Sequence, residues 1–132
     1  KYAASGYRGY YDVDLVAAKN GDLYVSESNT RRTGGSHVYK TALKLIGKDF
    51  LDYSYILSNN AWKLPKGITS TFEELIEKLS PVLFNKKTKE GVVIASANLL
   101  KQGQLAYIVF GRDEKHALEI EEKAQKILAQ LV

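Results

Sequence analysis

Oxygen-bearing side chains alternate along two short segments that flank an Asn-Gly pair at positions 20–21. Asp12 and Asp14 precede this pair, and Glu27 and Asn29 follow it. Asn-Gly favours a two-residue turn between antiparallel strands, so the sequence predicts a β-hairpin. With that turn, Asp14 faces Glu27. Asp12 then faces Asn29, and the two-residue period of a strand places all four side chains on one face.

Such a face suits a hard divalent cation. Like charges directly opposed across a sheet are destabilising unless a counter-charge offsets them. Mg²⁺ takes carboxylate and carbonyl oxygens together with water and substrate phosphates. We therefore predict a site for Mg²⁺ or Mn²⁺ at Asp14, Glu27 and Asn29, to which Asp12 would add a ligand or a hydrogen bond. Arg31 falls on the same face and suits a phosphate or a carboxylate.

Two conditions limit this interpretation. A three-residue turn would shift the pairing by one position and place Asp14 and Glu27 on opposite faces, whereas a two- or four-residue loop preserves it. The polar face is also explained by an ordinary antiparallel sheet with one solvated side. The pattern of residues alone leaves both interpretations open.

The remaining sequence predicts an α+β fold, an antiparallel sheet with helices packed on it. We expect one domain over residues 1–132, with a metal-binding hairpin and helix at 1–48, a helical region at 49–90, and a β-hairpin plus terminal helix at 91–132. The elements expected after the first hairpin are a helix from Ser36 to about Gly47, a helix over 49–57, a loop over 59–67, a capped helix over 71–79, strands over 91–100 and 104–111, and a helix from Asp113 to the end.

Composition excludes several classes of function. The chain has no cysteine, which rules out disulfide frameworks and thiolate metal sites. No apolar run is long enough to span a bilayer, so we expect a cytoplasmic protein without a membrane partner. The 19 basic residues are interleaved with 15 acidic ones and give a net charge of only +4, which gives nucleic-acid binding little support.

The segment from Asp12 to Arg31 resembles the final strand pair of ATP-grasp ligases, including the Asp-to-Glu spacing and the intervening Asn-Gly turn. The resemblance implies the C-terminal portion of an ATP-grasp fold, of the carboxylate-amine or peptide ligase type. In that family, residues matching Glu27 and Asn29 hold Mg²⁺ against the ATP phosphates, and in several members the residue matching Asp14 joins them. Arg31 matches an arginine that in some members contacts the acyl phosphate or the substrate.

The segment that follows is similar to the glycine-containing loop that leads into a helix in these ligases, where backbone N–H groups suit an anion. Without the resemblance, His37 is best explained as a surface residue of a helix. His116, in the first turn of the last helix, is also expected on the surface, without a functional role. The resemblance implies substrate contacts in this loop, at Arg32, Gly34, Gly35, Ser36 and His37.

The implied reaction uses ATP to convert a carboxylate into an acyl phosphate, which an amine then attacks. Its partners would be a small carboxylate, an amine and the N-terminal nucleotide-binding half of the same protein. That half supplies the ATP-binding lysines and a flexible glycine-rich loop, which this chain lacks, and the start at Lys1 fits a piece of a longer polypeptide. We expect the chain alone to be inactive. A non-catalytic ligand-binding module and a nucleic-acid-binding α+β domain remain alternatives.

Overall fold

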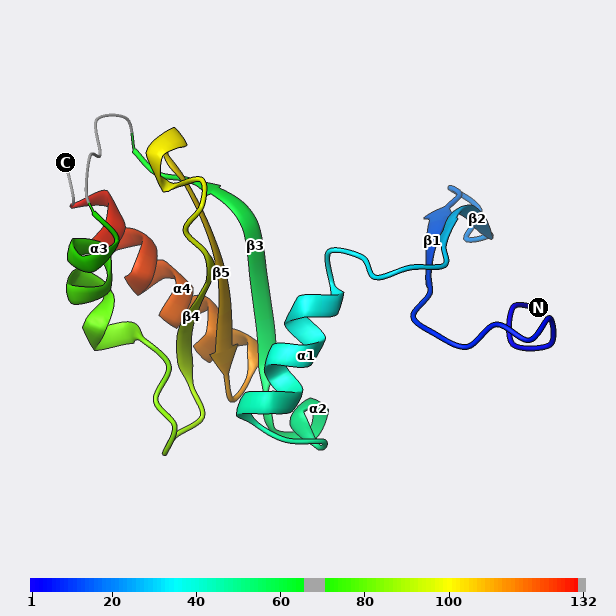
Figure 1. Ribbon diagram of the computed structural model, residues 1–132, viewed down its shortest axis with the longest axis horizontal. Helices are drawn as coiled ribbons and strands as arrows, with labels where there is room; N and C mark the ends of the chain where they lie inside the picture. The colour runs from blue at the N-terminus through cyan, green and yellow to red at the C-terminus, as the bar shows by residue number, and fades with distance from the viewer. Residues whose placement is uncertain (66–70, 131–132) are drawn as a thin grey trace. The chain divides into compact units, whose positions relative to one another are not determined.

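The computed structural model describes residues 1–65 and 71–130 and has an α+β fold, as the sequence predicts (Figure 1). The chain forms two compact units, Lys1–Thr41 and Ala42–Val132, and each contains one antiparallel sheet. Within the described residues no helix is long and apolar enough to cross a membrane. The elements are β1 (Asp12–Ala17), β2 (Leu23–Asn29), α1 (Ser36–Leu45), α2 (Phe50–Tyr53), β3 (Tyr55–Lys63), α3 (Phe72–Leu79), η1 (Ser80–Val82), β4 (Gly91–Ser96), η2 (Leu100–Gln102), β5 (Gln104–Gly111) and α4 (Glu114–Ala129).

The sheet of the first unit is the predicted hairpin of β1 and β2, but its turn differs from the prediction. The N–H of Ala18 donates to the carbonyl of Asp22 at 2.8 Å, so residues 19–21 form a three-residue loop. Gly21 adopts a φ of 90°, a conformation that glycine accepts without steric cost. The expected two-residue turn, with Lys19 facing Asp22, is therefore wrong.

The three-residue loop shifts the pairing of β1 and β2 by one residue, and a β-bulge in β2 shifts it back. Near the turn Ala17 pairs with Leu23, one position away from the predicted pairing. Between Asp14 and Leu15 the register shifts back, which leaves Ser26 as the extra residue of β2. The Ser26 hydroxyl donates to the backbone carbonyl of Asp14 at 3.2 Å and so contacts the opposite strand at the bulge.

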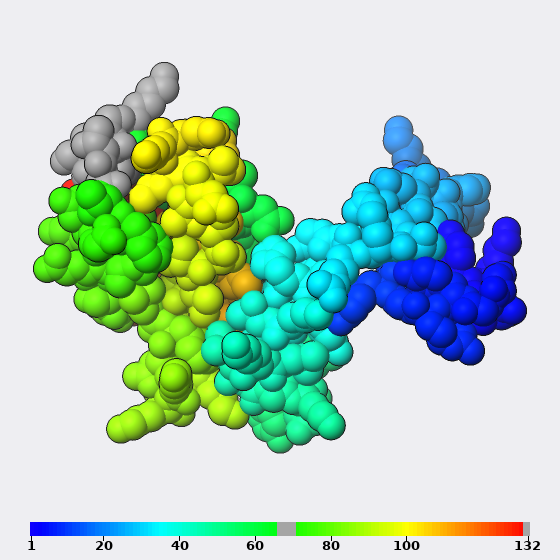
Figure 2. All heavy atoms as spheres, in the orientation of Figure 1, coloured from blue at the N-terminus to red at the C-terminus, as the bar shows by residue number. Residues whose placement is uncertain are grey.

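The second unit contains a three-stranded sheet in the order β3-β5-β4, with β5 in the centre. The side chains of Tyr107 and Val109 on β5 join the main core cluster, together with Leu75 of α3 and Leu128 of α4. On the opposite face of β5, Phe110 packs edge-on against Phe84, with ring centroids 5.4 Å apart. Most residues of β5 are buried, and little of the strand is visible on the face that Figure 2 shows.

Residues 49–63 differ from the helix and loop that the sequence predicts. The helix expected over 49–57 is only the single turn of α2, and β3 begins two residues after it. β3 also replaces most of the loop expected over 59–67, the end of which lies outside the described residues. Tyr55 pairs with Gly111 and Lys63 with Gln104, so this strand depends on partners some fifty positions away that local sequence patterns do not reveal.

The other predicted elements of this unit are confirmed, except that the strand expected over 91–100 ends at Ser96 and Leu100 begins η2. Thr71 and Glu74 form the expected capping box at the start of α3, with reciprocal side chain to backbone hydrogen bonds. β4 and β5 pair antiparallel, and Asp113 caps α4 by accepting a hydrogen bond from the N–H of His116 at 2.8 Å. α1 begins at Ser36 and ends before Gly47, as predicted.

Candidate metal site on the β1–β2 hairpin

Four oxygen-bearing residues occupy two neighbouring cross-strand pairs at the open end of the hairpin. Asp14 is directly opposite Glu27, and Asp12 is directly opposite Asn29. Directly opposed residues of an antiparallel pair project to the same side, and every second residue of a strand does as well. The predicted pairing is therefore confirmed, although it arises from a three-residue loop and a bulge.

The carboxylates of this face lack a cationic partner among the residues that the structure describes. In the described part of the chain, Asp12, Asp14 and Glu27 take part in no ion pair. Arg31, four residues after Glu27, donates from Nη2 to the Oδ1 atom of Asn29 at 2.9 Å. The arginine thus contacts the amide and leaves the opposed Asp14 and Glu27 without a counter-charge.

Tyrosines of the segment before β1 make hydrogen bonds to the hairpin at positions that are not on this polar face. The hydroxyl of Tyr2 is hydrogen-bonded to Ser28, whose position in β2 alternates with those of Glu27 and Asn29. The Tyr7 hydroxyl bonds to the carbonyls of Tyr10 and Thr30, at 2.7 and 3.0 Å. These bonds join the end of β2 to the segment before β1 and do not involve the side chains of Asp12, Asp14, Glu27 or Asn29.

The chemistry of this donor set fits Mg²⁺ only in part. Mg²⁺ in enzymes is often bound by one or two carboxylates, with water and substrate phosphates completing the octahedron. Asp14 and Glu27 supply two carboxylates. The amide oxygen of Asn29, which accepts from Arg31, has a second lone pair for a metal ion. Among residues 1–65 and 71–130, no three Asp, Glu or His side chains converge closely enough to hold a metal ion unaided. Within the described residues, this set of oxygens is therefore not by itself a complete metal-binding site.

The loop after the hairpin carries the remaining residues of the predicted site. The Arg32 guanidinium lies over the Tyr10 ring, 5.7 Å from its centroid, and the Lys40 ammonium lies 5.5 Å from the same centroid. The Ser36 hydroxyl accepts a hydrogen bond from the N–H of Thr33 at 3.0 Å and so tightens the turn into α1. The loop residues with solvent-exposed positions are Arg31, Arg32, Gly34, Gly35 and His37.

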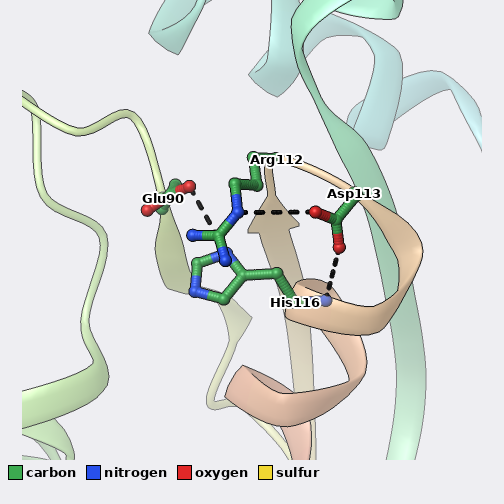
Figure 3. Close-up of polar contacts among 4 residues, drawn as sticks. All are labelled: Glu90, Arg112, Asp113 and His116. Carbon is green, nitrogen blue, oxygen red and sulfur yellow. Dashed lines mark hydrogen bonds and ion pairs between the residues drawn. The ribbon is translucent and has the colours of Figure 1, made fainter.

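A second polar cluster, in the second unit, was missed by the sequence prediction. His116 was expected on the surface, but its side chain is only 20% exposed and its Nδ1 atom lies 3.3 Å from Oε1 of Glu90 (Figure 3). Both residues line a cleft of about 320 Å³ between η1, the 85–90 turn and α4, which Lys123 also borders. Glu90 and His116 are far apart in sequence, so no local motif signals the pair.

A buried tyrosine forms a third polar group, inside the core of the second unit. Tyr107 is 2% exposed, and its hydroxyl donates to the Glu121 carboxylate at 2.7 Å and accepts from Gln125 at 3.0 Å. Burial, followed by the hydrogen bond to Glu121, raises the pKa of Tyr107 well above the ordinary tyrosine value. The hydroxyl is therefore a structural anchor between β5 and α4 and stays protonated near neutral pH.

No protein-family model matches the sequence, and comparison with curated proteins gives no match either.

Proposed function

We propose that this chain supplies the metal-binding hairpin of an ATP-grasp ligase that activates a carboxylate for attack by an amine. The observation that carries the proposal is the register of β1 and β2, in which Asp14 opposes Glu27 and Asp12 opposes Asn29. A bulge at Ser26 maintains this pairing despite the three-residue loop. Neighbouring pairs of oxygen ligands without a counter-charge are a reason to expect a cation at this position.

Each residue of the face has a distinct part in the proposed reaction. Asp14, Glu27 and Asn29 would hold Mg²⁺, which neutralises charge on the ATP phosphates when bound. Arg31, already hydrogen-bonded to Asn29, has further N–H groups with which to orient a carboxylate or a phosphoryl group. Catalysis by this face would come from positioning and charge stabilisation.

The apolar residues of the hairpin support a further part of the proposal, its association with a nucleotide-binding half. Leu23 and Val25 are 65% and 66% exposed, and Leu15, Val16 and Tyr24 are also more than half exposed. A two-stranded hairpin is marginally stable by itself, because it buries little apolar surface. Exposed apolar side chains on such a hairpin would form the contact surface for more of the ATP-grasp sheet.

The function is tested in a polypeptide that joins this chain to a nucleotide-binding half. ADP formation that requires Mg²⁺, a carboxylate and an amine is expected. Glu27→Gln and Asn29→Ala should each lower turnover by about a hundredfold or more, as the loss of transition-state charge stabilisation does in other enzymes. The chain by itself should not hydrolyse ATP.

The matched control is Asp22→Asn, which removes a carboxylate from the turn of the same hairpin, where Asp22 bonds to Asn20. This variant should retain full turnover. Near-normal turnover of both Glu27→Gln and Asn29→Ala, with folding verified by circular dichroism, would exclude the metal-binding role of this face.

A second candidate function is nucleic-acid or nucleotide binding by the aromatic and basic surface of the first unit. Tyr10 is 41% exposed and has both Arg32 and Lys40 over its ring, and Tyr11 and Tyr24 are more exposed still. Aromatic rings beside cations suit stacked bases and phosphates. Binding of a single-stranded oligonucleotide that weakens steeply with salt would favour this function over the ligase.

A further inference from the structure

The strand β3 forms one edge of the sheet in the second unit. In the described part of the chain it pairs only with β5. The opposite edge is partly covered, because the N–H of Phe84 donates to the carbonyl of Val92 on β4 at 2.9 Å. Natural edge strands are commonly protected from further pairing by lysine, by proline or by short length. β3 has nine residues, no proline and one charged residue, Lys63 at its end.

Part of this edge is regular enough to pair with another extended chain. The register of β3 against β5 shifts between Asn59 and Trp62, so the five residues Tyr55–Asn59 form the regular stretch. None of these five residues is charged. The outer backbone groups of Tyr55–Asn59 therefore offer hydrogen bonds to a further strand.

A cleft of about 620 Å³ follows the exposed side of α4 and has an acidic lining. Leu118 lies in the middle of this lining and is 49% exposed. The charged residues that line the cleft are Glu114, Lys115, Glu119, Glu121 and Glu122. The cleft is therefore negative although the chain as a whole carries a charge of +4.

The contacts of β3 place the acidic cleft on the side of α4 that lies next to this strand. The Tyr55 hydroxyl donates to the Glu114 carboxylate at 3.3 Å, and the charge of Glu114 raises the pKa of Tyr55. Further along, Trp62 packs edge-on against Tyr107, with ring centroids 6.3 Å apart. The Tyr107 hydroxyl in turn donates to Glu121 at 2.7 Å. Strand and helix thus start at the same end of the sheet and stay in contact along their length.

The spacing of the α4 side chains matches that of an extended peptide. Glu114, Leu118 and Glu122 follow one another at four-residue intervals, which are about 6 Å apart along a helix axis. Side chains on one face of a strand are about 7 Å apart, so three alternate residues of a peptide fall beside these three positions. Glu122 already pairs with Lys126 at 2.6 Å, but both side chains are exposed, and such a pair exchanges partners at little cost.

We propose that β3 and α4 form a docking site for a basic extended peptide, which adds a strand beside Tyr55–Asn59. Main-chain hydrogen bonds supply the affinity of such a complex, and alternate side chains supply its specificity. Two basic side chains meet Glu114 and Glu122, and an apolar one between them packs on Leu118. A second copy of β3 fits the cleft less well, because Tyr55–Asn59 carries no cation. The site lies within the second unit and is independent of the hairpin face.

The test uses the capped heptapeptide Thr-Lys-Thr-Leu-Thr-Lys-Thr, titrated into the isotopically labelled full chain and followed by NMR. Resonances of β3 and of the first three turns of α4 should shift together, and added salt should weaken binding. The peptide Thr-Thr-Lys-Lys-Leu-Thr-Thr has the same composition and charge without the alternation, and its affinity should be lower by about tenfold. Equal affinity of the two peptides would mean that only the net charge is recognised, which overturns the proposal.

Methylated peptides test the strand pairing separately. In an antiparallel or parallel strand, alternate N–H groups point to the same neighbour. N-methylation of the Lys and Leu residues therefore blocks one set of N–H groups, and N-methylation of the Thr residues blocks the other. One of these peptides should lose affinity by about tenfold or more, and the other should keep most of it. Equal affinities of the two methylated peptides would contradict pairing with β3.

Variants of the chain test the acidic side of the site. Glu114→Gln should weaken binding of the alternating peptide about threefold, and Glu114→Gln combined with Glu122→Gln about tenfold. The matched control is Glu77→Gln, an exposed position on α3 that should leave the affinity unchanged. Unchanged affinity of the double variant overturns the proposal. So does a wild-type chain that binds no peptide, or whose β3 edge is already occupied by a second copy in sedimentation and NMR.

Discussion

The opposed carboxylates of the hairpin have different surroundings from two carboxylates of α4. Glu121 accepts a hydrogen bond from Tyr107, and Glu122 pairs with Lys126 at 2.6 Å. By contrast Asp14 and Glu27 oppose each other across a strand pair and have no cation among the described residues. Unfavourable local arrangements of this kind are tolerated where they serve a ligand, and they lower stability in its absence.

Removing one of these charges should stabilise the hairpin in the absence of metal. Glu27→Gln keeps the size of the side chain and relieves its repulsion from Asp14, which should add about 0.5 kcal/mol to the stability of the strand pair. The measurement is hydrogen exchange of the β1 and β2 amides without divalent cations. Slower exchange is expected in Glu27→Gln and no change in Asp22→Asn. Faster exchange in Glu27→Gln would mean that the carboxylate makes a favourable contact within the chain.

Tyr107 should make stability fall at alkaline pH. Its pKa is raised in the folded protein, chiefly by burial, so the folded state retains the proton at a pH where the unfolded chain has lost it. The resulting stabilisation is complete below about pH 10 and is lost as the pH rises from there. Tyr107→Phe should cost about 1 kcal/mol at pH 7. Urea unfolding from pH 8 to 11 should show a flatter decline for Tyr107→Phe than for the wild type; equal slopes would contradict this assignment.

At the scale of elements, the first hairpin shows where prediction from sequence succeeds and where it fails. The alternation of Asp12 and Asp14 with Glu27 and Asn29 correctly predicts which residues face each other. The Asn-Gly pair wrongly predicts the loop length, because the choice between a two- and a three-residue loop also depends on the bulge at Ser26. The unpredicted third loop residue and the unpredicted bulge shift the register in opposite directions, so the predicted pairing is still correct at the candidate site.

The second unit separates local from non-local signals in the same way. The capping box of α3 and the Asp113 cap of α4 lie within four residues and are predicted correctly. β3 was predicted as helix and loop, because its pairing with β5 is set by distant residues. The contact of His116 with Glu90 escaped prediction for the same reason.

Gly91 should be essential for the junction between the 85–90 turn and β4. Gly91→Ala requires an alanine at a φ of 119° with its Cβ 2.6 Å from the Leu83 carbonyl oxygen. We expect a loss of more than about 2 kcal/mol in urea unfolding. Gly103→Ala is the control, because its φ of 70° is strained but nothing lies within 4 Å of a Cβ there, so it should cost only about 1 kcal/mol. Equal losses in the two variants would show that close packing at Gly91 contributes nothing.

At the scale of the whole molecule, the two units differ in how much apolar surface they bury. The core cluster lies in the second unit, where Leu75, Leu79 and Val109 are fully buried. In the first unit the hairpin exposes residues such as Leu23 and Val25. Burial of apolar surface supplies most folding stability, so the two units should differ strongly in stability.

Hydrogen exchange at a single pH tests this difference. The amides of β5 should exchange only through global unfolding, whereas those of β1 and β2 should exchange faster by a factor on the order of a hundred. Joining the chain to a nucleotide-binding half should selectively slow exchange in the hairpin. Equal protection of β1 and β5 in the chain alone would contradict the assignment of the hairpin as the weaker unit.

The most direct test of the hairpin as a metal site is Mn²⁺ titration of the isotopically labelled chain, followed by paramagnetic broadening of its amide resonances. Broadening detects weak binding, which is expected when substrate phosphates are absent. The resonances of Asp14, Glu27 and Asn29 should broaden first, Mg²⁺ should reverse the effect, and Glu27→Gln should abolish it. Broadening that reaches Asp22 and Asp113 at the same Mn²⁺ concentration, or that persists in Glu27→Gln, would contradict a metal site on this face.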